Sequence, residues 1–357
     1  RRASGRGARG SGGRWTVRPK LKALGEQVLV ITGASSGIGR TTARLAAERG
    51  ARVVLAARDR RALGDAEREI RAAGGEATAV RCDVTDYGAV EGLAEAAVRA
   101  YGGFDTWVNN AGTSIYGRLD DVPLADLRRL MDVNFWGVVH GSRVAAARLR
   151  STGGALINVG SVLSDRAIPL QGMYCATKHA VKGFTDALRM ELEEEDAPVS
   201  VSLVKPASIG TPFYDVARNY LPVAPRPVPP VYAPEVAARA ILRCAVRPTR
   251  ELYAGGAGRG LAVGGQLAPR LTDRAMERTL FAMQQHAERP ETAPEGNLWE
   301  ALDLAAERGT YGTHARERSV YAAAGSRPGL TTLVVAGLGV GLAMLLGVGR
   351  RDAPRDD

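Results

Sequence analysis

From residue 27 onward, short apolar runs alternate with longer amphipathic stretches of helical period. Neighbouring parallel strands must be joined by a crossover of helical length, so this alternation is typical of βαβ units. It predicts an α/β fold built on a doubly wound, mostly parallel sheet. The seven expected strands cover residues 27–32, 52–57, 77–82, 106–109, 155–160, 199–205 and 251–254.

Composition divides the chain into parts. Residues 1–22 are basic, rich in Gly and free of acidic side chains, which predicts a mobile tail. Residues 23–262 hold the expected strands and helices and predict a single domain. Residues 263–328 form a C-terminal extension, with an amphipathic helix expected near residues 267–289. Closely spaced prolines between residues 206 and 234 exclude long regular elements there and predict a loop or lid.

The apolar segment at residues 330–348 carries no charged side chain, and Arg350 and Arg351 follow it. As a helix it would be about 28 Å long, enough to cross a bilayer. Gly337 and Gly341 form a GxxxG pattern that allows two helices to pair. A buried helix or an interfacial hairpin is the alternative. We expect a transmembrane helix, and hence a membrane-associated protein.

The net charge of +10 raises the question of nucleic-acid binding. After the tail, basic residues are interleaved with Asp and Glu on expected helix surfaces, so we expect no nucleic-acid partner. Cys82, Cys175 and Cys244 are odd in number and lack metal-ligand or redox spacing. We therefore expect no metal site, and a reducing compartment.

A glycine-rich turn, TGASSGIG, joins the first expected strand to a helix. A strand, such a turn and a helix N-terminus in this order are typical of a Rossmann-type dinucleotide site, because free N–H groups face the pyrophosphate. An ordinary tight turn is the alternative, but the strand before it and the helix after it favour the dinucleotide. The candidate cofactor-binding residues of this turn are Thr32, Gly33, Ser35, Ser36, Gly37, Ile38 and Gly39.

Further motifs follow in a fixed order. They are Asp83 with Val84 after the third strand, the NNAG run of Asn109, Asn110, Ala111 and Gly112 after the fourth, Asn134 on the next helix, Ser161 after the fifth strand, and the YxxxK pair Tyr174 and Lys178. Together with the spacing TGxxxGxG, this set resembles the short-chain dehydrogenase/reductase family. The resemblance covers residues 27 to about 255, roughly two thirds of the chain.

The resemblance implies hydride transfer between a nicotinamide and a carbonyl or alcohol carbon. Tyr174 is then the catalytic acid, Lys178 stabilises its phenolate and holds the nicotinamide ribose, and Ser161 donates to the substrate oxygen. Asn134 resembles the residue that holds a proton-relay water, and Asp83 the one that contacts the adenine. Because residues four apart share a helix face, we expect the Lys178 ammonium to lower the pKa of Tyr174.

Cofactor choice is expected at the end of the second strand, where a carboxylate binds a ribose 2′-OH and a cation a 2′-phosphate. Ala57 stands at the family's acidic position and Arg58 follows it, which favours NADP(H). The alternative is that Arg58 only marks the start of the next helix, where the negative charge of Asp59 reduces the positive potential. Since NADPH is cytoplasmic, we expect the catalytic domain in the cytoplasm.

The chain departs from the family pattern at two places. Pro206-Ala207 stands where most members have Pro-Gly, and Gly160 replaces the first Ser of a usual Ser-Ser pair. Pro206, Ile209 and Thr211 still match cofactor-contacting positions, and Ser161 remains.

The leading hypothesis is an NADP(H)-dependent carbonyl reductase or alcohol dehydrogenase. Its substrate is expected to be hydrophobic, because the lid carries the apolar side chains of Phe213, Tyr214, Tyr220, Leu221 and Val231. The alternative is a non-catalytic NADP(H)-binding sensor or membrane scaffold on the same fold. The intact Ser161, Tyr174 and Lys178 argue against it, and homo-oligomerisation is left open.

Overall fold

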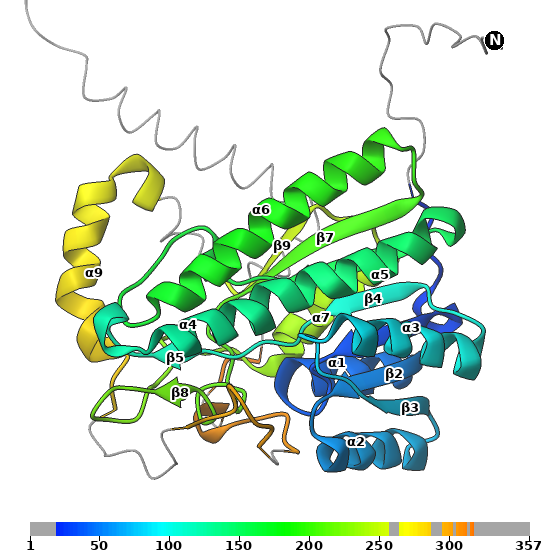
Figure 1. The fold of residues 1–357 in the computed structure, drawn as a ribbon, viewed down its shortest axis with the longest axis horizontal. Helices are drawn as coiled ribbons and strands as arrows, with labels where there is room; N and C mark the ends of the chain where they lie inside the picture. Colours follow the sequence, from blue (N-terminus) through cyan, green and yellow to red (C-terminus); the bar gives the residue numbers. More distant parts are fainter. Residues whose placement is uncertain (1–18, 257–263, 287–294, 303–304, 313–314, 318–357) are drawn as a thin grey trace, which may run out of the picture.

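The computed structural model describes residues 19–256, 264–286, 295–302, 305–312 and 315–317 (Figure 1). A seven-stranded sheet lies between two layers of helices, and all its strand pairs are parallel. Each strand of this sheet begins and ends within one residue of the range expected from the sequence, so the predicted doubly wound parallel sheet is confirmed. The spatial order is β3 (Glu76–Arg81), β2 (Arg52–Ala57), β1 (Val28–Thr32), β4 (Thr106–Asn109), β6 (Gly154–Val159), β7 (Val199–Pro206) and β9 (Glu251–Ala254).

Helices cover both faces of the sheet, which is why its strands read as nearly continuous apolar runs. One layer contains α1 (Gly37–Ala47), α2 (Arg60–Ala72) and α7 (Pro234–Val246), and the other contains α3 (Tyr87–Tyr101), α5 (Gly137–Thr152) and α6 (Gly172–Glu194). Alternate residues of β1 feed the two cores: Leu29 and Ile31 face the first layer, while Val28 and Val30 face the second.

The strand order reverses between β1 and β4. In an open parallel sheet the connections diverge at such a point and leave a crevice beyond the carboxyl ends of the two strands. The glycine turn leaves β1 at this edge and the NNAG run leaves β4 beside it. The topology therefore brings the two motifs together.

Helices α4 (Leu124–Met131) and α5 are joined by a π-helical turn, η3 (Asp132–Trp136), which contains Asn134. A π-turn inside an α-helix widens the hydrogen-bond ladder by one residue and is frequent at functional sites. Asn134 thus lies on an irregular turn rather than on the regular helix expected from the sequence.

The proline-rich lid at residues 207–233 contains one short strand, β8 (Arg218–Asn219), which pairs with β5 (Ile115–Tyr116). Beyond the sheet, α9 (Pro269–Met283) stands where an amphipathic helix was expected, and its Met276 and Leu280 pack near Ile168. The later part of the extension, orange in Figure 1, packs against the lid beside β8.

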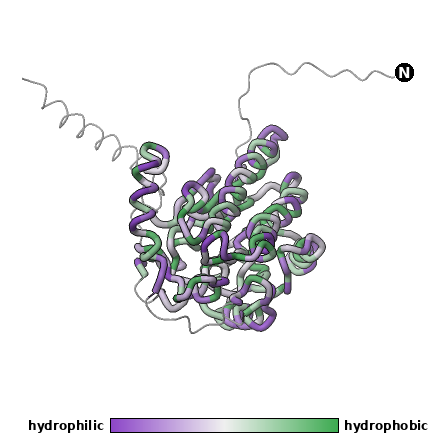
Figure 2. The backbone as a smooth tube through the Cα atoms, turned by 60° about the vertical axis from the view of Figure 1, so that its left-hand side comes forward, coloured by the Kyte–Doolittle hydropathy of each residue, from purple (hydrophilic) through white to green (hydrophobic). Residues whose placement is uncertain are grey.

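The expected membrane-associated location is wrong for the part of the chain that the structure describes. No helix there is both long enough and apolar enough to cross a bilayer. The longest, α6, includes Lys178, Lys182 and Arg189, and Figure 2 shows hydrophilic and hydrophobic stretches alternating along the outer helices. Residues 330–348, on which that expectation rested, lie outside the described residues, as do residues 1–18 of the predicted tail.

Candidate active site

A cavity of ≈ 450 Å³ lies at the carboxyl ends of the strands and extends from the glycine turn to Tyr174. It brings together most of the residues singled out in the sequence, while Thr32, Gly39 and Asn134 are not among its lining residues. The expected site residues on its walls are Gly33, Ser35, Ser36, Gly37, Ile38, Arg58, Asp83, Val84, Asn110, Ala111, Gly112, Ser161, Tyr174, Lys178, Pro206, Ile209 and Thr211.

Close backbone packing explains the glycines of the turn. Gly33 has φ +67°, and a Cβ added there would lie 2.8 Å from the Ala111 Cα. A Cβ on Gly39 would lie 2.1 Å from the Gly33 carbonyl oxygen. The start of α1 is thereby held against the turn, and Ser36, Gly37 and Ile38 at this helix N-terminus line the cavity. This arrangement fits the diphosphate of a dinucleotide.

Thr32 and Asn110 tie the two motif loops together. The Thr32 hydroxyl accepts hydrogen bonds from the backbone N–H groups of Asn110 (3.0 Å) and Ala111 (3.1 Å). In return, the Asn110 side-chain amide donates to the Thr32 carbonyl oxygen at 3.0 Å. The structure thus gives Thr32 a bracing position between the loops, away from the cavity wall.

Tyr174, Lys178 and Ser161 meet at the other end of the cavity. The Ser161 hydroxyl lies close enough to the Tyr174 hydroxyl to lower its pKa. The Lys178 Nζ donates to the Val159 carbonyl oxygen at 3.0 Å and lies 5.7 Å from the centroid of the Tyr174 ring. All three side chains are buried. One proton donor, one cation and one further hydroxyl therefore converge where a substrate oxygen could sit.

The expected lowering of the Tyr174 pKa is not found. Burial raises the pKa of Tyr174, and the nearby Ser161 hydroxyl offsets this only in part. Burial also lowers the pKa of Lys178 to about 8. The reason is that both groups lie in a poorly hydrated site, where the charged form of each is disfavoured.

The side chain of Asn134 is committed to neighbouring residues. Its Oδ1 accepts from the Thr113 backbone N–H at 2.9 Å, and its Nδ2 donates to the Thr113 carbonyl oxygen at 2.9 Å and to the Thr177 hydroxyl at 3.2 Å. It therefore links the NNAG loop to α6, the helix that carries Tyr174. Its expected role in holding a relay water stays a prediction.

Asp83 lies at the cavity wall but is held by partners that the sequence did not indicate. Its Oδ1 accepts from the Thr85 backbone N–H (3.0 Å) and hydroxyl (2.9 Å), and its Oδ2 accepts from Arg129 at 3.1 Å. Burial pushes the pKa of Asp83 upward, but these bonds outweigh it and hold the pKa below the ordinary value. Asp83 is thus a fixed carboxylate.

Gly160 stands where the family pattern has a second Ser, and its surroundings are tight. A Cβ at Gly160 would lie 2.9 Å from the Ser164 Oγ and 3.0 Å from a Leu203 methyl carbon. The Ser164 Oγ itself accepts a hydrogen bond from the Ser161 backbone N–H at 3.1 Å. Ser164 therefore occupies part of the space beside Gly160 and supports Ser161.

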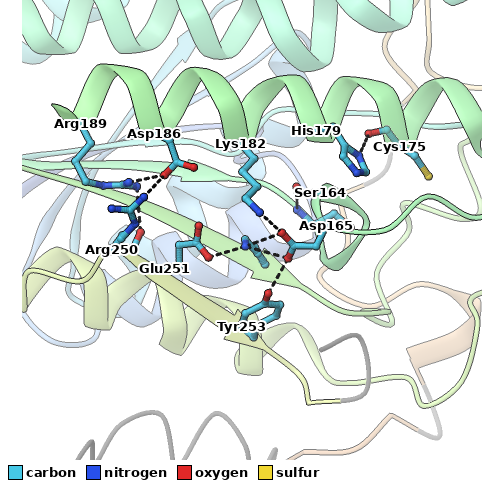
Figure 3. A network of polar contacts seen from close by, with 12 residues as sticks. Ser164, Asp165, Cys175, His179, Lys182, Asp186, Arg189, Arg250, Glu251 and Tyr253 are labelled. Carbon is cyan, nitrogen blue, oxygen red and sulfur yellow. Dashed lines mark hydrogen bonds and ion pairs between the residues drawn. The ribbon is translucent and has the colours of Figure 1, made fainter. Parts of the chain in front are cut away.

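A buried charge cluster fixes the loop that carries Ser161 (Figure 3). Asp165 accepts hydrogen bonds from Lys182 on α6, from the Tyr253 hydroxyl on β9 (2.7 Å) and from Lys205 on β7 (2.9 Å). Lys205 also pairs with Glu251 at 2.6 Å. The side chains of Lys205 and Asp165 are only 1% and 5% exposed, so their charges depend on these partners. Three separate elements thus hold the residue that ends the Ser161 turn.

The sequence missed a second set of cavity residues. Leu280 of α9 lies in the wall near Tyr174, and Asn297, Ala301 and Leu302 of the C-terminal extension lie in the wall near Arg58. No motif marks these positions in the sequence, and only Leu280 lies in an expected helix, which nothing in the sequence placed at the cavity. They reach the cavity only because the chain beyond the sheet folds back over it.

The described residues show no metal centre. Within them, no group of three or more His, Cys, Asp or Glu side chains is arranged to hold a metal ion. The three cysteines are buried and not paired with one another, and burial raises the pKa of Cys82 to about 12 and of Cys175 to about 11. Such thiols stay protonated at neutral pH, which makes them poor nucleophiles.

Comparisons with known proteins agree with this geometry. Residues 27–220 match the short chain dehydrogenase family. The oxidoreductase YxnA of Bacillus subtilis is 46% identical over 323 residues, which cover 89% of this chain and 90% of YxnA. The 11-beta-hydroxysteroid dehydrogenase A of Sesamum indicum is 34% identical over 235 residues, covering 63% of this chain and 67% of that protein.

Two solved structures are similar to this chain. The alcohol dehydrogenase of the archaeon Thermococcus sibiricus, complexed with 5-hydroxy-NADP, has a TM-score of 0.56 and 27% identity, covering 64% of this chain and 95% of its own. A short-chain type dehydrogenase/reductase of Mycobacterium marinum has a TM-score of 0.57 and 30% identity, covering 64% of this chain and 94% of its own.

Proposed function

The chain belongs to the short chain dehydrogenase family, an oxidoreductase family whose fold binds a nicotinamide cofactor, and from this premise we propose that it uses NADP(H) to interconvert a carbonyl and a secondary alcohol on a hydrophobic substrate. One observation carries the proposal. Buried Tyr174 lies beside Ser161 and one helical turn from Lys178, in the same cavity as the glycine turn. Bound there, the nicotinamide supplies the hydride.

Tyr174 is the proton donor in the proposed reduction. Burial raises its pKa, so the phenol keeps its proton at neutral pH and can give it to an alkoxide oxygen that forms on the substrate. The Ser161 hydroxyl, held beside Tyr174, donates to the same oxygen and fixes its position. The two hydroxyls thus act on one substrate atom from one wall of the cavity.

Lys178 supports the phenolate that remains on Tyr174. With a pKa of about 8 the Lys178 amine is largely charged at pH 7, and its ammonium lies 5.7 Å from the Tyr174 ring centroid. A positive charge at that range stabilises a phenolate more than a neutral phenol. Its bond to the Val159 carbonyl oxygen anchors the Nζ to the end of β6.

The choice of NADP(H) over NAD(H) rests on the end of β2. Ala57 offers no carboxylate to a ribose 2′-OH, and Arg58 lines the cavity. A guanidinium forms charge-assisted hydrogen bonds with a phosphate. The similar alcohol dehydrogenase of Thermococcus sibiricus was solved with an NADP derivative, which supports the same choice.

The substrate class follows from the cavity wall around Tyr174. Apolar side chains predominate there, and the charged residues that line the whole cavity are Arg58, Asp59, Asp83 and Lys178. The apolar wall consists of Leu163, Ile168, Phe213, Val228 and Leu280. Such a wall favours an uncharged substrate such as a steroid, a retinoid-like carbonyl or a fatty aldehyde. The name of the relative from Sesamum indicum, a hydroxysteroid dehydrogenase, supports the first of these.

A substrate panel tests the proposal. NADPH consumption by purified protein is followed with a steroid ketone, a retinoid aldehyde, a long-chain fatty aldehyde and, as a charged comparison, a short keto acid. We expect turnover with at least one apolar carbonyl, none with the keto acid, and turnover by Tyr174→Phe that is slower by about 100-fold or more. Tight NADPH binding without turnover on the whole panel would instead favour the non-catalytic sensor.

A further inference from the structure

Residues 295–302 of the C-terminal extension lie across the cofactor cleft, and we call them the strap. In Figure 1 they belong to the orange segment that lies between β8 and α2. The strap is far along the chain from every dinucleotide motif. It nevertheless contributes Asn297, Ala301 and Leu302 to the cavity wall.

One side of the strap is fastened to the β2 and α4 side of the cleft. The Arg58 guanidinium donates to the carbonyl oxygens of Asn297, Leu298 (3.4 Å), Trp299 (3.0 Å) and Glu300 (3.4 Å). The Trp299 indole N–H donates to Asp126 at 2.8 Å, and the Arg129 guanidinium lies 5.5 Å from the Trp299 ring centroid.

The other side is fastened to the NNAG loop and the lid. The Asn297 side chain accepts a hydrogen bond from the Thr113 hydroxyl, and its backbone N–H donates to the Val216 carbonyl oxygen at 2.8 Å. Further along, the Gly309 N–H donates to the Gly210 carbonyl oxygen at 3.2 Å. The extension therefore bridges the cleft from one rim to the other.

The strap covers the cavity without filling it. Beneath Ala301 and Leu302 the cavity still runs from Gly33 and Asp83 to Lys178. Within the strap only Leu298 is a buried side chain, while Trp299 is 51% exposed. Since burial of apolar surface is the main stabilising term, a segment that buries one side chain can detach at modest cost.

We propose that the strap is a cofactor-retaining element, a part of the dinucleotide site that this chain's C-terminal extension supplies. It closes over the adenosine and diphosphate half of the bound dinucleotide, and release of the dinucleotide requires the strap to open. The proposal rests on the proposed use of a nicotinamide dinucleotide. The opposite role, exclusion of the dinucleotide, would use the same contacts, because the strap engages Arg58 and the Gly37 N–H donates to the Ala306 carbonyl oxygen at 2.9 Å.

Stopped-flow NADPH fluorescence on the full-length protein separates these roles. Trp299→Ala removes the anchor to Asp126 and Arg129 from the exposed side of the strap, and Trp136→Ala, 48% exposed and outside the strap, is the matched control. We expect Trp299→Ala to raise the NADPH dissociation rate by about fivefold or more and the Kd by about threefold or more. The control should change neither.

Each other outcome is informative. A lower Kd in Trp299→Ala, or binding that appears only in the variant, would show that the strap excludes the dinucleotide and would overturn the proposal. An unchanged dissociation rate and Kd in Trp299→Ala would also overturn it. Absence of binding in the wild type and both variants would overturn the proposed function as well. As a second measurement, NADPH should slow amide hydrogen exchange at residues 297–302 of the wild type, and faster exchange there would contradict retention.

Discussion

The guanidinium of Arg58 donates a hydrogen bond of 3.0 Å to the carbonyl oxygen of Trp299, which lies 241 residues further along the chain. The end of β2, where this fold distinguishes the two ribose types, is thus in contact with the C-terminal extension. Burial lowers the pKa of Arg58, but the guanidinium stays charged at any physiological pH. Arg58 therefore contacts the strap, and under the proposed use of NADP(H) the same residue would also bind the 2′-phosphate.

Arg58→Ala should lower the preference for NADPH over NADH by about tenfold or more, because a charge-assisted contact with a phosphate is worth roughly 1.5 to 3 kcal/mol. The ratio of kcat/KM for the two cofactors measures this. Arg60→Ala, an exposed arginine at the start of α2, is the control and should leave the ratio unchanged. A wild-type preference for NADH would contradict the assignment of Arg58 to the 2′-phosphate.

Tyr174→Phe should reduce kcat by about 100-fold or more while leaving the Kd of NADPH nearly unchanged, since general-acid removal carries a penalty of that size. Steady-state kinetics and a fluorescence titration give the two values. Tyr87→Phe removes a hydroxyl from a tyrosine that is 38% exposed on α3, and it should behave as the wild type. Retention of more than about a tenth of kcat would assign the proton to another group.

Carbonyl reduction should lose rate as the pH rises through about 8. Burial lowers the pKa of Lys178 to that value, so the amine is charged below it and neutral above it, and the support for the phenolate disappears on the alkaline side. The pKa of Tyr174 is raised by burial, so the phenol stays protonated throughout this range. A profile of kcat/KM against pH should show this fall on its alkaline side. The residual activity of Lys178→Arg, whose guanidinium does not titrate, should lack it.

Asp165→Asn should destabilise the protein by about 3 kcal/mol, because it leaves the buried Lys205 ammonium and the half-buried Lys182 ammonium facing a neutral amide. Urea unfolding followed by circular dichroism measures the loss. Arg150→Gln disrupts an ion pair with Glu195 on the exposed surface and should hardly move the midpoint. Equal midpoints for the two variants would show that the cluster in Figure 3 does not hold the Ser161 loop.

Leu280→Ala should extend the range of accepted substrates to bulkier apolar carbonyls, and Leu280→Trp should narrow it, because this side chain of α9 lines the cavity near Tyr174. Relative kcat/KM over a series of alkyl ketones of increasing size reports the change, and a methylene in such a pocket is worth about 1 to 3 kcal/mol. Leu271→Ala, 70% exposed on the same helix, is the control. An unchanged series would place the substrate away from α9.

The sequence by itself determined the fold and the composition of most of the cavity. Each strand was readable because a buried parallel strand is a continuous apolar run, and this pattern is local. The glycine turn was readable for a similar reason, since Gly33 and Gly39 stand where backbone packing leaves no room for a Cβ. Motifs that follow the ends of parallel strands meet at one sheet edge, so their convergence followed from the strand order.

The tertiary structure alone decided the rest. Burial acts through every neighbouring element, so no local pattern could show that the pKa of Tyr174 is raised rather than lowered. The partners of Asp165 come from α6, β7 and β9, and those of Arg58 come from the strap. Backbone carbonyl groups supply the strap contacts, and every residue type carries one, so the sequence holds no trace of where that segment binds.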